Sequence, residues 1–191
     1  MSRLTEADAD AGLAVADAGA GRGGADPGHT GPATADADAG LAGLDGAELT
    51  LATAADTEAL GERIAARLSA GDVVLLAGPL GAGKTVLARG IGRGLGVAGA
   101  VTSPTFVIAR EHPPAPGGRG VALVHVDAYR LGGRAELDDL DLDTELASAV
   151  MVVEWGEGLA DRLARRYLLV RLSRQDDDSR VARLSWVSDP K

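Results

Sequence analysis

The chain has 191 residues, of which 46% are hydrophobic, and this length predicts one folded domain with a packed core. It contains no cysteine, which excludes disulfides, cysteine-based zinc sites and thiol nucleophiles. The formal net charge is -9, but the first 46 residues, with eight acidic and two basic residues, contribute -6 of it. The rest is nearly balanced and lacks the dense basic surface that direct, tight binding of RNA or DNA needs.

Residues 1–46 consist mostly of Ala, Asp and Gly, and the seven residues Asp8–Ala14 recur at Asp36–Ala42. Such a low-complexity segment has too few apolar side chains to offset the entropy of ordering. We therefore expect a disordered acidic tail over 1–46 and a folded domain over 47–191. The first residues lack the features of a signal peptide, and no segment approaches the roughly 18 apolar residues that span a bilayer. We expect a cytoplasmic protein with no membrane partner.

The folded part begins with a predicted strand over Glu48–Ala52 and an amphipathic helix. Asp56 is the expected N-cap of this helix, and Gly71 follows its last turn. Apolar residues four apart form its buried face: Leu60, Ile64 and Leu68.

A continuous apolar run over Asp72–Ala77 predicts a central strand that is covered on both faces. It leads directly into the loop Gly78-Pro79-Leu80-Gly81-Ala82-Gly83-Lys84-Thr85. Glycines let backbone N–H groups turn inward at a helix N-terminus, where they bind phosphates. Lys84 would reach the β and γ phosphates, and the Thr85 hydroxyl would meet Mg²⁺. This loop predicts binding of a nucleoside triphosphate, namely ATP with magnesium. The alternative interpretation is a glycine turn that only connects the strand to the helix.

Beyond Thr85 a helix is expected to end among Gly92, Gly94 and Gly96, and strands and helices then alternate. Strands are predicted at Thr105–Ala109, Val121–Val126, Ala149–Val153, Tyr167–Leu172 and Val181–Val187. Helices are predicted at Arg134–Leu140 and Glu157–Arg165, with a Pro/Gly loop at Glu111–Gly120. The pattern indicates an α/β P-loop NTPase fold with a mainly parallel sheet, and the polar turn before Val181 predicts an antiparallel edge hairpin near the C-terminus.

Two acidic residues follow apolar strands, Asp127 and Glu154. The carboxyl ends of parallel strands border the ligand crevice of an open sheet, and carboxylates there can hold magnesium or orient an attacking water. The residues alone do not decide which of the two contacts the metal.

Three further features have two interpretations each. The segment Thr102–Phe106 is either an ordinary turn or a switch that senses the γ phosphate through a hydroxyl. His125, on the same strand face as Asp127, is either a metal ligand or base or a structural residue, and we expect it to be structural because no other histidine pairs with it at ligand spacing. Arg89 and Arg130 are either surface residues or groups that stabilise phosphate charge.

The P-loop, Ser103-Pro104-Thr105-Phe106, the run from His125 to Leu131 and Val153-Glu154-Trp155 together resemble the TsaE (YjeE) family from about Ala47 to Val187. Members are bacterial ATPases required for threonylcarbamoyl modification of the adenosine next to the anticodon in tRNAs that read ANN codons. The resemblance implies weak ATP hydrolysis by the chain alone and action on a complex of TsaD and TsaB, through which tRNA is an indirect partner.

For individual residues, the resemblance implies that Gly78 to Thr85 holds the phosphates and that Thr85 and Glu154 hold magnesium. Asp127 would assist hydrolysis, Lys84 and Glu154 would also act in catalysis, and Thr57 would lie near the nucleotide. Ser103–Phe106 would be the switch segment, and Trp155 would flank the site.

Two other functions remain open: a small-molecule P-loop kinase and a nucleotide-dependent regulator that does not hydrolyse ATP. A kinase would need an acceptor pocket and an arginine-rich lid, and the sequence shows no such lid. A GTPase is excluded because the guanine-reading motif requires asparagine, and the chain has none.

Overall fold

A computed structural model describes residues 45–103, 109–128, 146–156 and 164–188. Its elements are β1 (Glu48–Leu51), α2 (Ala54–Ala65), β2 (Val73–Ala77), α3 (Lys84–Leu95), β3 (Ala109–His112), β4 (Ala122–Asp127), β5 (Ala149–Glu154), β6 (Arg166–Arg174) and β7 (Arg180–Ser188). Among the described residues, no helix is long and apolar enough to cross a bilayer.

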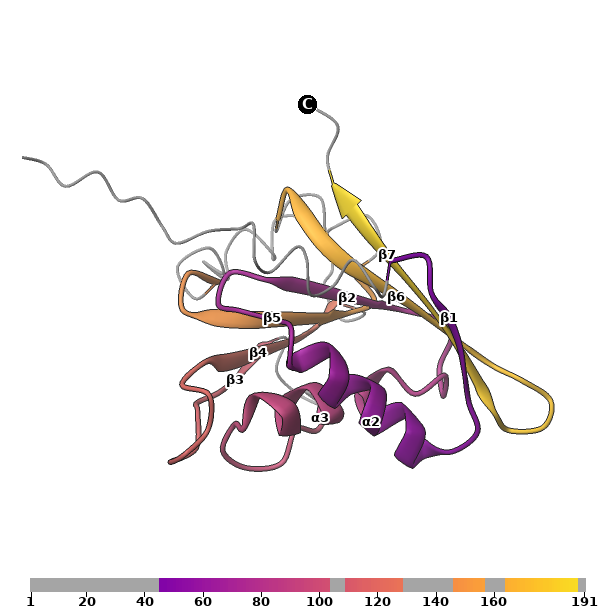
Figure 1. The fold of residues 1–191 in the computed structure, drawn as a ribbon, viewed down its shortest axis with the longest axis horizontal. Coiled ribbons are helices and arrows are strands. Elements are labelled where there is room, and N and C mark those ends of the chain that lie inside the picture. The colour runs from indigo at the N-terminus through magenta and orange to yellow at the C-terminus, as the bar shows by residue number, and fades with distance from the viewer. Residues whose placement is uncertain (1–44, 104–108, 129–145, 157–163, 189–191) are drawn as a thin grey trace, which may run out of the picture. The chain divides into compact units, whose positions relative to one another are not determined.

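The seven described strands form one sheet in the order β1-β7-β6-β2-β5-β4-β3 (Figure 1). The four central strands, β6, β2, β5 and β4, run parallel, and the outer pairs are antiparallel. This confirms the predicted α/β class with a parallel centre. The C-terminal hairpin of β6 and β7 is present, and β1 adds one strand outside it.

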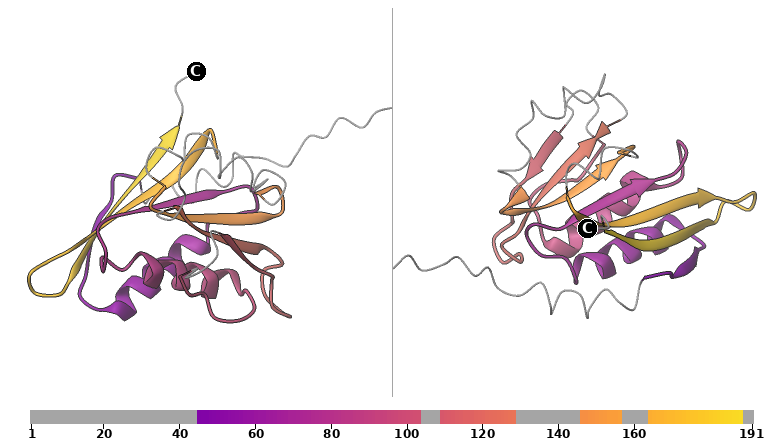
Figure 2. Two further views of the ribbon diagram at one scale, coloured as in Figure 1. Left: turned by 180° about the vertical axis from the view of Figure 1, so that it is seen from behind. Right: turned by 90° about the horizontal axis from the view of Figure 1, so that it is seen from above.

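The helices α2 and α3 lie side by side on one face of the sheet, as Figures 1 and 2 show. Residues of β2 alternate between the two faces, so that Val74 and Leu76 join the core beneath these helices while Val73 and Leu75 join a second core. Every residue of β2 is buried, which confirms the prediction of a strand covered on both faces.

Three glycines let α2 and α3 pack with their backbones in close contact. A Cβ on Gly61 would stand 2.5 Å from the carbonyl oxygen of Leu87, and a Cβ on Gly90 would stand 2.1 Å from that of Glu58. A Cβ on Gly94 would stand 2.6 Å from the Cβ of Ala65 and 3.0 Å from the Cα of Glu62. Glycine is therefore required at this crossing for lack of space and not for its backbone angles.

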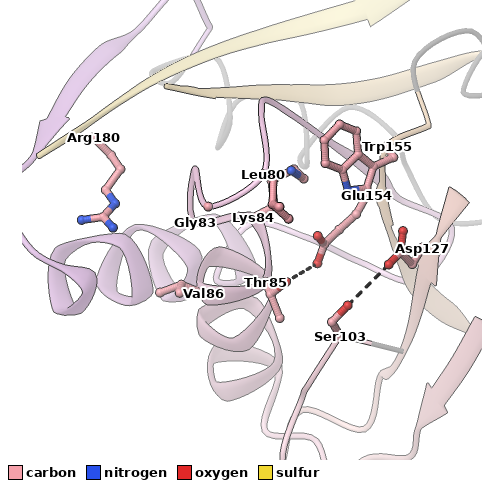
Figure 3. Close-up of a pocket in the computed structure, with 11 residues that line it drawn as sticks. Leu80, Gly83, Lys84, Thr85, Val86, Ser103, Asp127, Glu154, Trp155 and Arg180 are labelled. Atoms are coloured by element: carbon pink, nitrogen blue, oxygen red, sulfur yellow. Dashed lines mark hydrogen bonds between the residues drawn. The ribbon is translucent and has the colours of Figure 1, made fainter. Parts of the chain in front are cut away.

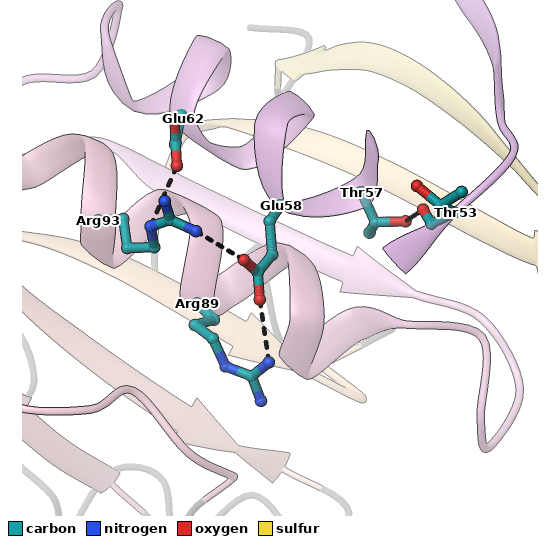
Figure 4. Close-up of polar contacts among 6 residues, drawn as sticks. All are labelled: Thr53, Thr57, Glu58, Glu62, Arg89 and Arg93. Carbon is teal, nitrogen blue, oxygen red and sulfur yellow. Dashed lines mark hydrogen bonds and ion pairs between the residues drawn. The ribbon is translucent and has the colours of Figure 1, made fainter. Parts of the chain in front are cut away.

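Ion pairs at the rim of the same crossing link the two helices (Figure 4). Glu58 accepts from Arg89 at 3.0 Å and from Arg93 at 2.7 Å, and Arg93 also reaches Glu62 at 3.2 Å. The hydrogen bond from Arg89 lowers the pKa of Glu58 below its ordinary value. Because these side chains are partly exposed, the ion pairs contribute less to the free energy of unfolding than the buried packing of the two helix backbones does.

The ends of α2 differ from the prediction. Thr53, not Asp56, is the N-cap: its hydroxyl accepts from the backbone N–H of Asp56 at 3.1 Å, and the Asp56 carboxylate accepts from the N–H of Thr53 at 2.8 Å. This is a capping box, so Asp56 is its third helical residue. The helix ends at Ala65, and Leu68 is buried beyond it, where Arg119 donates to the carbonyl oxygens of Ala65 and Leu68.

Strand boundaries elsewhere agree with the sequence to within two residues, apart from β3. The predicted loop at Glu111–Gly120 is wrong at its start, because β3 continues to His112 and pairs antiparallel with β4. Several predictions lie outside the described residues. These are the tail up to residue 44, the switch segment after Ser103, all but the last residue of the strand at Thr105–Ala109, the helix at Arg134–Leu140, most of that at Glu157–Arg165, and Arg130.

Candidate nucleotide-binding site

The predicted phosphate loop joins β2 to α3 and depends on its glycines. Gly78, Gly81 and Gly83 have φ angles of 138°, 80° and 104°, in the region that favours glycine. A Cβ on Gly78 would also stand 2.2 Å from the carbonyl oxygen of Leu172 in β6. Helix α3 starts at Lys84, and its N-cap residue, Gly83, provides no side-chain hydrogen bond to the first turn. The free N–H groups of that turn and the helix dipole favour an anion at this point.

Lys84 lies inside the loop. Its ammonium donates to the carbonyl oxygens of Gly78 at 2.8 Å and Pro79 at 3.0 Å, and it faces the Trp155 ring at 3.8 Å from the ring centre. Burial lowers the pKa of Lys84, and the nearby carboxylates of Glu154 and Asp127 partly offset this. A partly desolvated cation inside an anion-binding loop is suited to polyphosphate.

Glu154 lies at the carboxyl end of β5, and one of its oxygens has two partners. Oε1 accepts from the Thr85 hydroxyl at 2.9 Å and lies 2.9 Å from Nε2 of His125. His125 is fully buried, and Glu154 is 3% exposed. The carboxylate is therefore held between the first turn of α3 and the neighbouring strand β4.

Asp127 ends β4 directly beside Glu154, since the two are register partners in the parallel pair of β4 and β5. Its Oδ2 lies 3.4 Å from the Ser103 hydroxyl, a long hydrogen bond. Trp155 follows Glu154 with φ 61°, an uncommon conformation for a bulky residue, which aims the indole over Lys84. Strained residues of this kind cluster at ligand sites.

Most of these groups line one cavity of about 510 Å³, shown in Figure 3, but Gly78 and His125 do not. It brings together predicted residues from the loop and from both strand ends, with Ser103 and Trp155 beside them. Thr57 does not line it but packs behind the loop, where its methyl group lies 3.7 Å from the position of a Cβ on Gly83. Leu80, at the mouth, is 91% exposed.

Two residues of this region were not predicted as part of it. Arg180, the first residue of β7, lines the cavity. His125 was expected to be structural, and alternation along β4 placed it on the face of Asp127, but only the pairing of β4 with β5 puts it against Glu154. Arg89, considered for phosphate charge, pairs with Glu58 on α2.

A family model described as "Threonylcarbamoyl adenosine biosynthesis protein TsaE" matches residues 51–182. The chain belongs to the TsaE family. The match covers the P-loop and both acidic strand ends, and it confirms the resemblance expected from the motifs. A nucleotide-binding function follows from the family and the fold.

Relatives named "tRNA threonylcarbamoyladenosine biosynthesis protein TsaE" support this assignment. That of Mycobacterium bovis is 55% identical over 148 residues, covering 74% of this chain and 88% of the relative. That of Streptomyces coelicolor is 60% identical over 121 residues, covering 63% and 80%. A solved structure of Bacillus subtilis YdiB matches with a TM-score of 0.59 and 30% identity over 73% of this chain and 84% of that one. The P-loop fold is therefore shared with an experimentally determined relative.

Proposed function

We propose that this protein is a magnesium-dependent ATPase that acts in the threonylcarbamoyl modification of adenosine next to the anticodon in tRNAs reading ANN codons. The observation that carries the proposal is the hydrogen bond of 2.9 Å between Thr85, at the end of the P-loop, and Glu154. It joins the loop that would hold the phosphates to the carboxylate that would hold the metal. The names of the relatives supply the pathway.

The residues fit magnesium. The described residues contain no group of three or more His, Asp and Glu side chains placed as metal ligands. Mg²⁺ in nucleotide sites needs no such group, because it takes one or two protein oxygens and completes its shell with water and phosphate. Thr85 and Glu154 would provide those oxygens. Bound there, the ion would neutralise charge that develops on the phosphates.

Each remaining residue has a proposed task. The backbone from Gly78 to Thr85 would bind the phosphates, and Lys84 would leave the carbonyl oxygens of Gly78 and Pro79 to reach the β and γ phosphates. Asp127, beside Glu154 and 8% exposed, would orient the attacking water and accept its proton. Thr57 would support the nucleotide indirectly, through its contact with Gly83.

We propose that hydrolysis is slow in the isolated chain and faster in complex with TsaD and TsaB, through which the protein would serve tRNA in the cytoplasm. The exposed Leu80 supports a protein partner at the mouth of the cavity, because an apolar side chain there gains free energy when another surface covers it. Folding of 47–191 as the ATPase domain, with 1–46 as a tail outside it, is part of the proposal.

Phosphate release tests the proposal. The purified chain with ATP and Mg²⁺ should release phosphate slowly, and addition of TsaD and TsaB should accelerate it. Leu80→Ser should reduce the stimulated rate more than the rate of the chain alone. Rapid phosphate transfer to a small acceptor would contradict the proposal in favour of a kinase, and normal threonylcarbamoylation in cells lacking this protein would remove it from the pathway.

Substitutions separate the proposed roles. Lys84→Ala should abolish ATP binding, whereas Asp127→Ala should keep binding and lose hydrolysis. Glu154→Ala should lose the effect of Mg²⁺ on ATP affinity. If Asp127→Ala lost that effect and Glu154→Ala kept it, the two acidic residues would have exchanged roles.

A further inference from the structure

A second cavity, of about 450 Å³, lies beside the phosphate loop and has no task in the proposed chemistry. Its described lining combines the start of the loop, Gly78 and Pro79, with Trp155 and with residues of β6 and β7. Trp155 also borders the nucleotide cavity, and among the described residues it alone belongs to both linings. The two cavities are therefore neighbours that share one wall.

Two arginines of the second cavity lie on the sheet face opposite to α2 and α3. Arg171 is flanked in β6 by Val170 and Leu172, which join the core beneath these helices, so strand alternation places it on the other face. Arg183 of β7 is the register partner of Arg171 and lies on the same face. On its other side Arg171 pairs with Ala77, the last residue before the phosphate loop. Both guanidinium groups thus stand at the edge where that loop begins.

The charges of this pair favour an anion. Like charges directly opposite each other on adjacent strands are destabilising, and both arginines are exposed. Among the described residues, Arg183 contacts the carboxylate of Glu48 in β1, whose Oε2 lies 2.6 Å from Nε. This contact leaves the two terminal nitrogens of Arg183 without a hydrogen bond to the described part of the chain. An anion between the two guanidinium groups relieves their repulsion and accepts from both.

Ser173 supplies a third donor to the same cavity. It follows Arg171 by two residues in β6 and shares its face. Its Oγ accepts from Nε2 of Gln175 at 3.1 Å, which fixes the oxygen and leaves the hydroxyl hydrogen to donate to a ligand. Pro79 and Trp155 add apolar surface. A cavity of this size and composition holds more than a lone ion.

We propose that this cavity is a second anion site, which binds a small organic molecule through its carboxylate or phosphate group. Arg171 and Arg183 hold the oxygens of that group in charge-assisted hydrogen bonds, for which the planar fork of a guanidinium is well shaped. The Ser173 hydroxyl donates a further hydrogen bond, and the carbon atoms of the ligand lie against Trp155. This inference goes beyond the proposed function and does not depend on ATP binding.

NMR titration of the full ¹⁵N-labelled chain with two probes, succinate and glycerol 3-phosphate, tests the site and distinguishes carboxylate from phosphate ligands. Either probe should shift the indole N–H signal of Trp155. Arg171→Ala and Arg183→Ala should each raise the Kd on the order of tenfold, the usual effect of losing a hydrogen bond to a charged group. Arg174→Ala is the matched control, since Arg174 lies in β6 on the opposite face, 53% exposed, and should leave the Kd unchanged.

Glu48→Gln gives a result that a merely structural role would not produce. Because it removes the carboxylate that competes for Arg183, probe binding should tighten by roughly threefold, the value of an exposed ion pair. An unchanged or weaker affinity would contradict the assignment of Arg183 to the ligand. If Arg171→Ala proves unstable in thermal melting, Arg171→Gln, which keeps a polar side chain without the charge, decides the question by the same titrations.

Lys84→Ala separates this site from the phosphate loop and from the proposed function. The variant should lose ATP and keep both probes. Probe binding that Lys84→Ala abolishes, and that Arg171→Ala and Arg183→Ala leave intact, would place the probes in the loop and overturn the second site. Absence of a shift at Trp155 with either probe, or an equal loss of affinity in Arg174→Ala, would overturn it as well.

Discussion

Replacing Gly90 by alanine tests how closely α2 must pack against α3, the helix that carries Lys84 and Thr85. The new Cβ would stand 2.1 Å from the carbonyl oxygen of Glu58 and 2.9 Å from its Cα, whereas ordinary contacts begin at 3.4 Å. The obstacle is backbone, so no side-chain rotation relieves it. The helices must separate by about 1 Å, a gap that forfeits a quarter to a half of the dispersion energy between the atoms it parts.

The magnitude follows from two opposing contributions. Alanine favours the helix over glycine by about 1 kcal/mol. Overpacking in a rigid core costs about 3 kcal/mol at the upper end of its usual range, and a backbone collision belongs at that end. The net loss of unfolding free energy is therefore about 2 kcal/mol, which lowers Tm by about 6 °C in a domain of this size.

Urea unfolding followed by circular dichroism measures this loss, and Gly92→Ala on the same helix is the control. A Cβ on Gly92 would meet side-chain atoms, Val101 Cγ2 at 2.5 Å and Leu123 Cδ2 at 3.3 Å, which can shift more easily than backbone. We expect a smaller loss there. A Gly90→Ala protein as stable as the unsubstituted one would refute the reasoning, because the helix propensity of alanine would then outweigh the cost of separating α2 from α3.

Three further predictions concern other parts of the domain. His125→Leu should raise the Mg²⁺ concentration for half-maximal ATP hydrolysis by roughly tenfold, since it removes the hydrogen bond at 2.9 Å that orients Glu154; an unchanged concentration would contradict that role. Thr53→Ala should cost about 1 kcal/mol of unfolding free energy by removing the capping box, measured in urea with the exposed Thr50→Ala as control. Burial lowers the pKa of His112 below its ordinary 6.5, so the unfolded state takes up the proton first and stability is lost as pH falls below that value. His112→Gln should lack this contribution, and an identical pH dependence of unfolding in both proteins would rule it out.

The sequence was most informative where one local pattern determines the structure. The apolar run before Gly78 is short and flanked by glycines, which favours a buried strand, and the glycines after it have φ angles that other residues avoid. Asp127 and Glu154 were placed correctly at strand ends, because a strand's end is visible where an apolar run stops. Their adjacency follows from the pairing of β4 with β5, which no local pattern contains.

Features that depend on contacts between distant segments could not be predicted. Arg180 reaches the nucleotide cavity only because β7 pairs between β1 and β6, and its position in the sequence is an ordinary strand start. The N-cap was misassigned because Thr53 and Asp56 are both good capping residues, and the reciprocal hydrogen bonds decide between them. The glycines of α3 suggested only where that helix ends, whereas two of them, Gly90 and Gly94, make room for α2.

The two tryptophans allow binding at the loop to be followed by intrinsic fluorescence, with one of them as an internal reference. The chain has two tryptophans, and each faces a cation: Trp155 faces Lys84 at 3.8 Å, and Trp186 faces Arg166 at 4.1 Å. If Lys84 moves toward phosphate, the emission of Trp155 changes because its neighbouring charge leaves, while Trp186, on the last strand, keeps its own. Fluorescence of the unlabelled chain can thus follow the binding of phosphate groups in the loop in real time. Trp186→Phe leaves the Trp155 emission as the tryptophan signal.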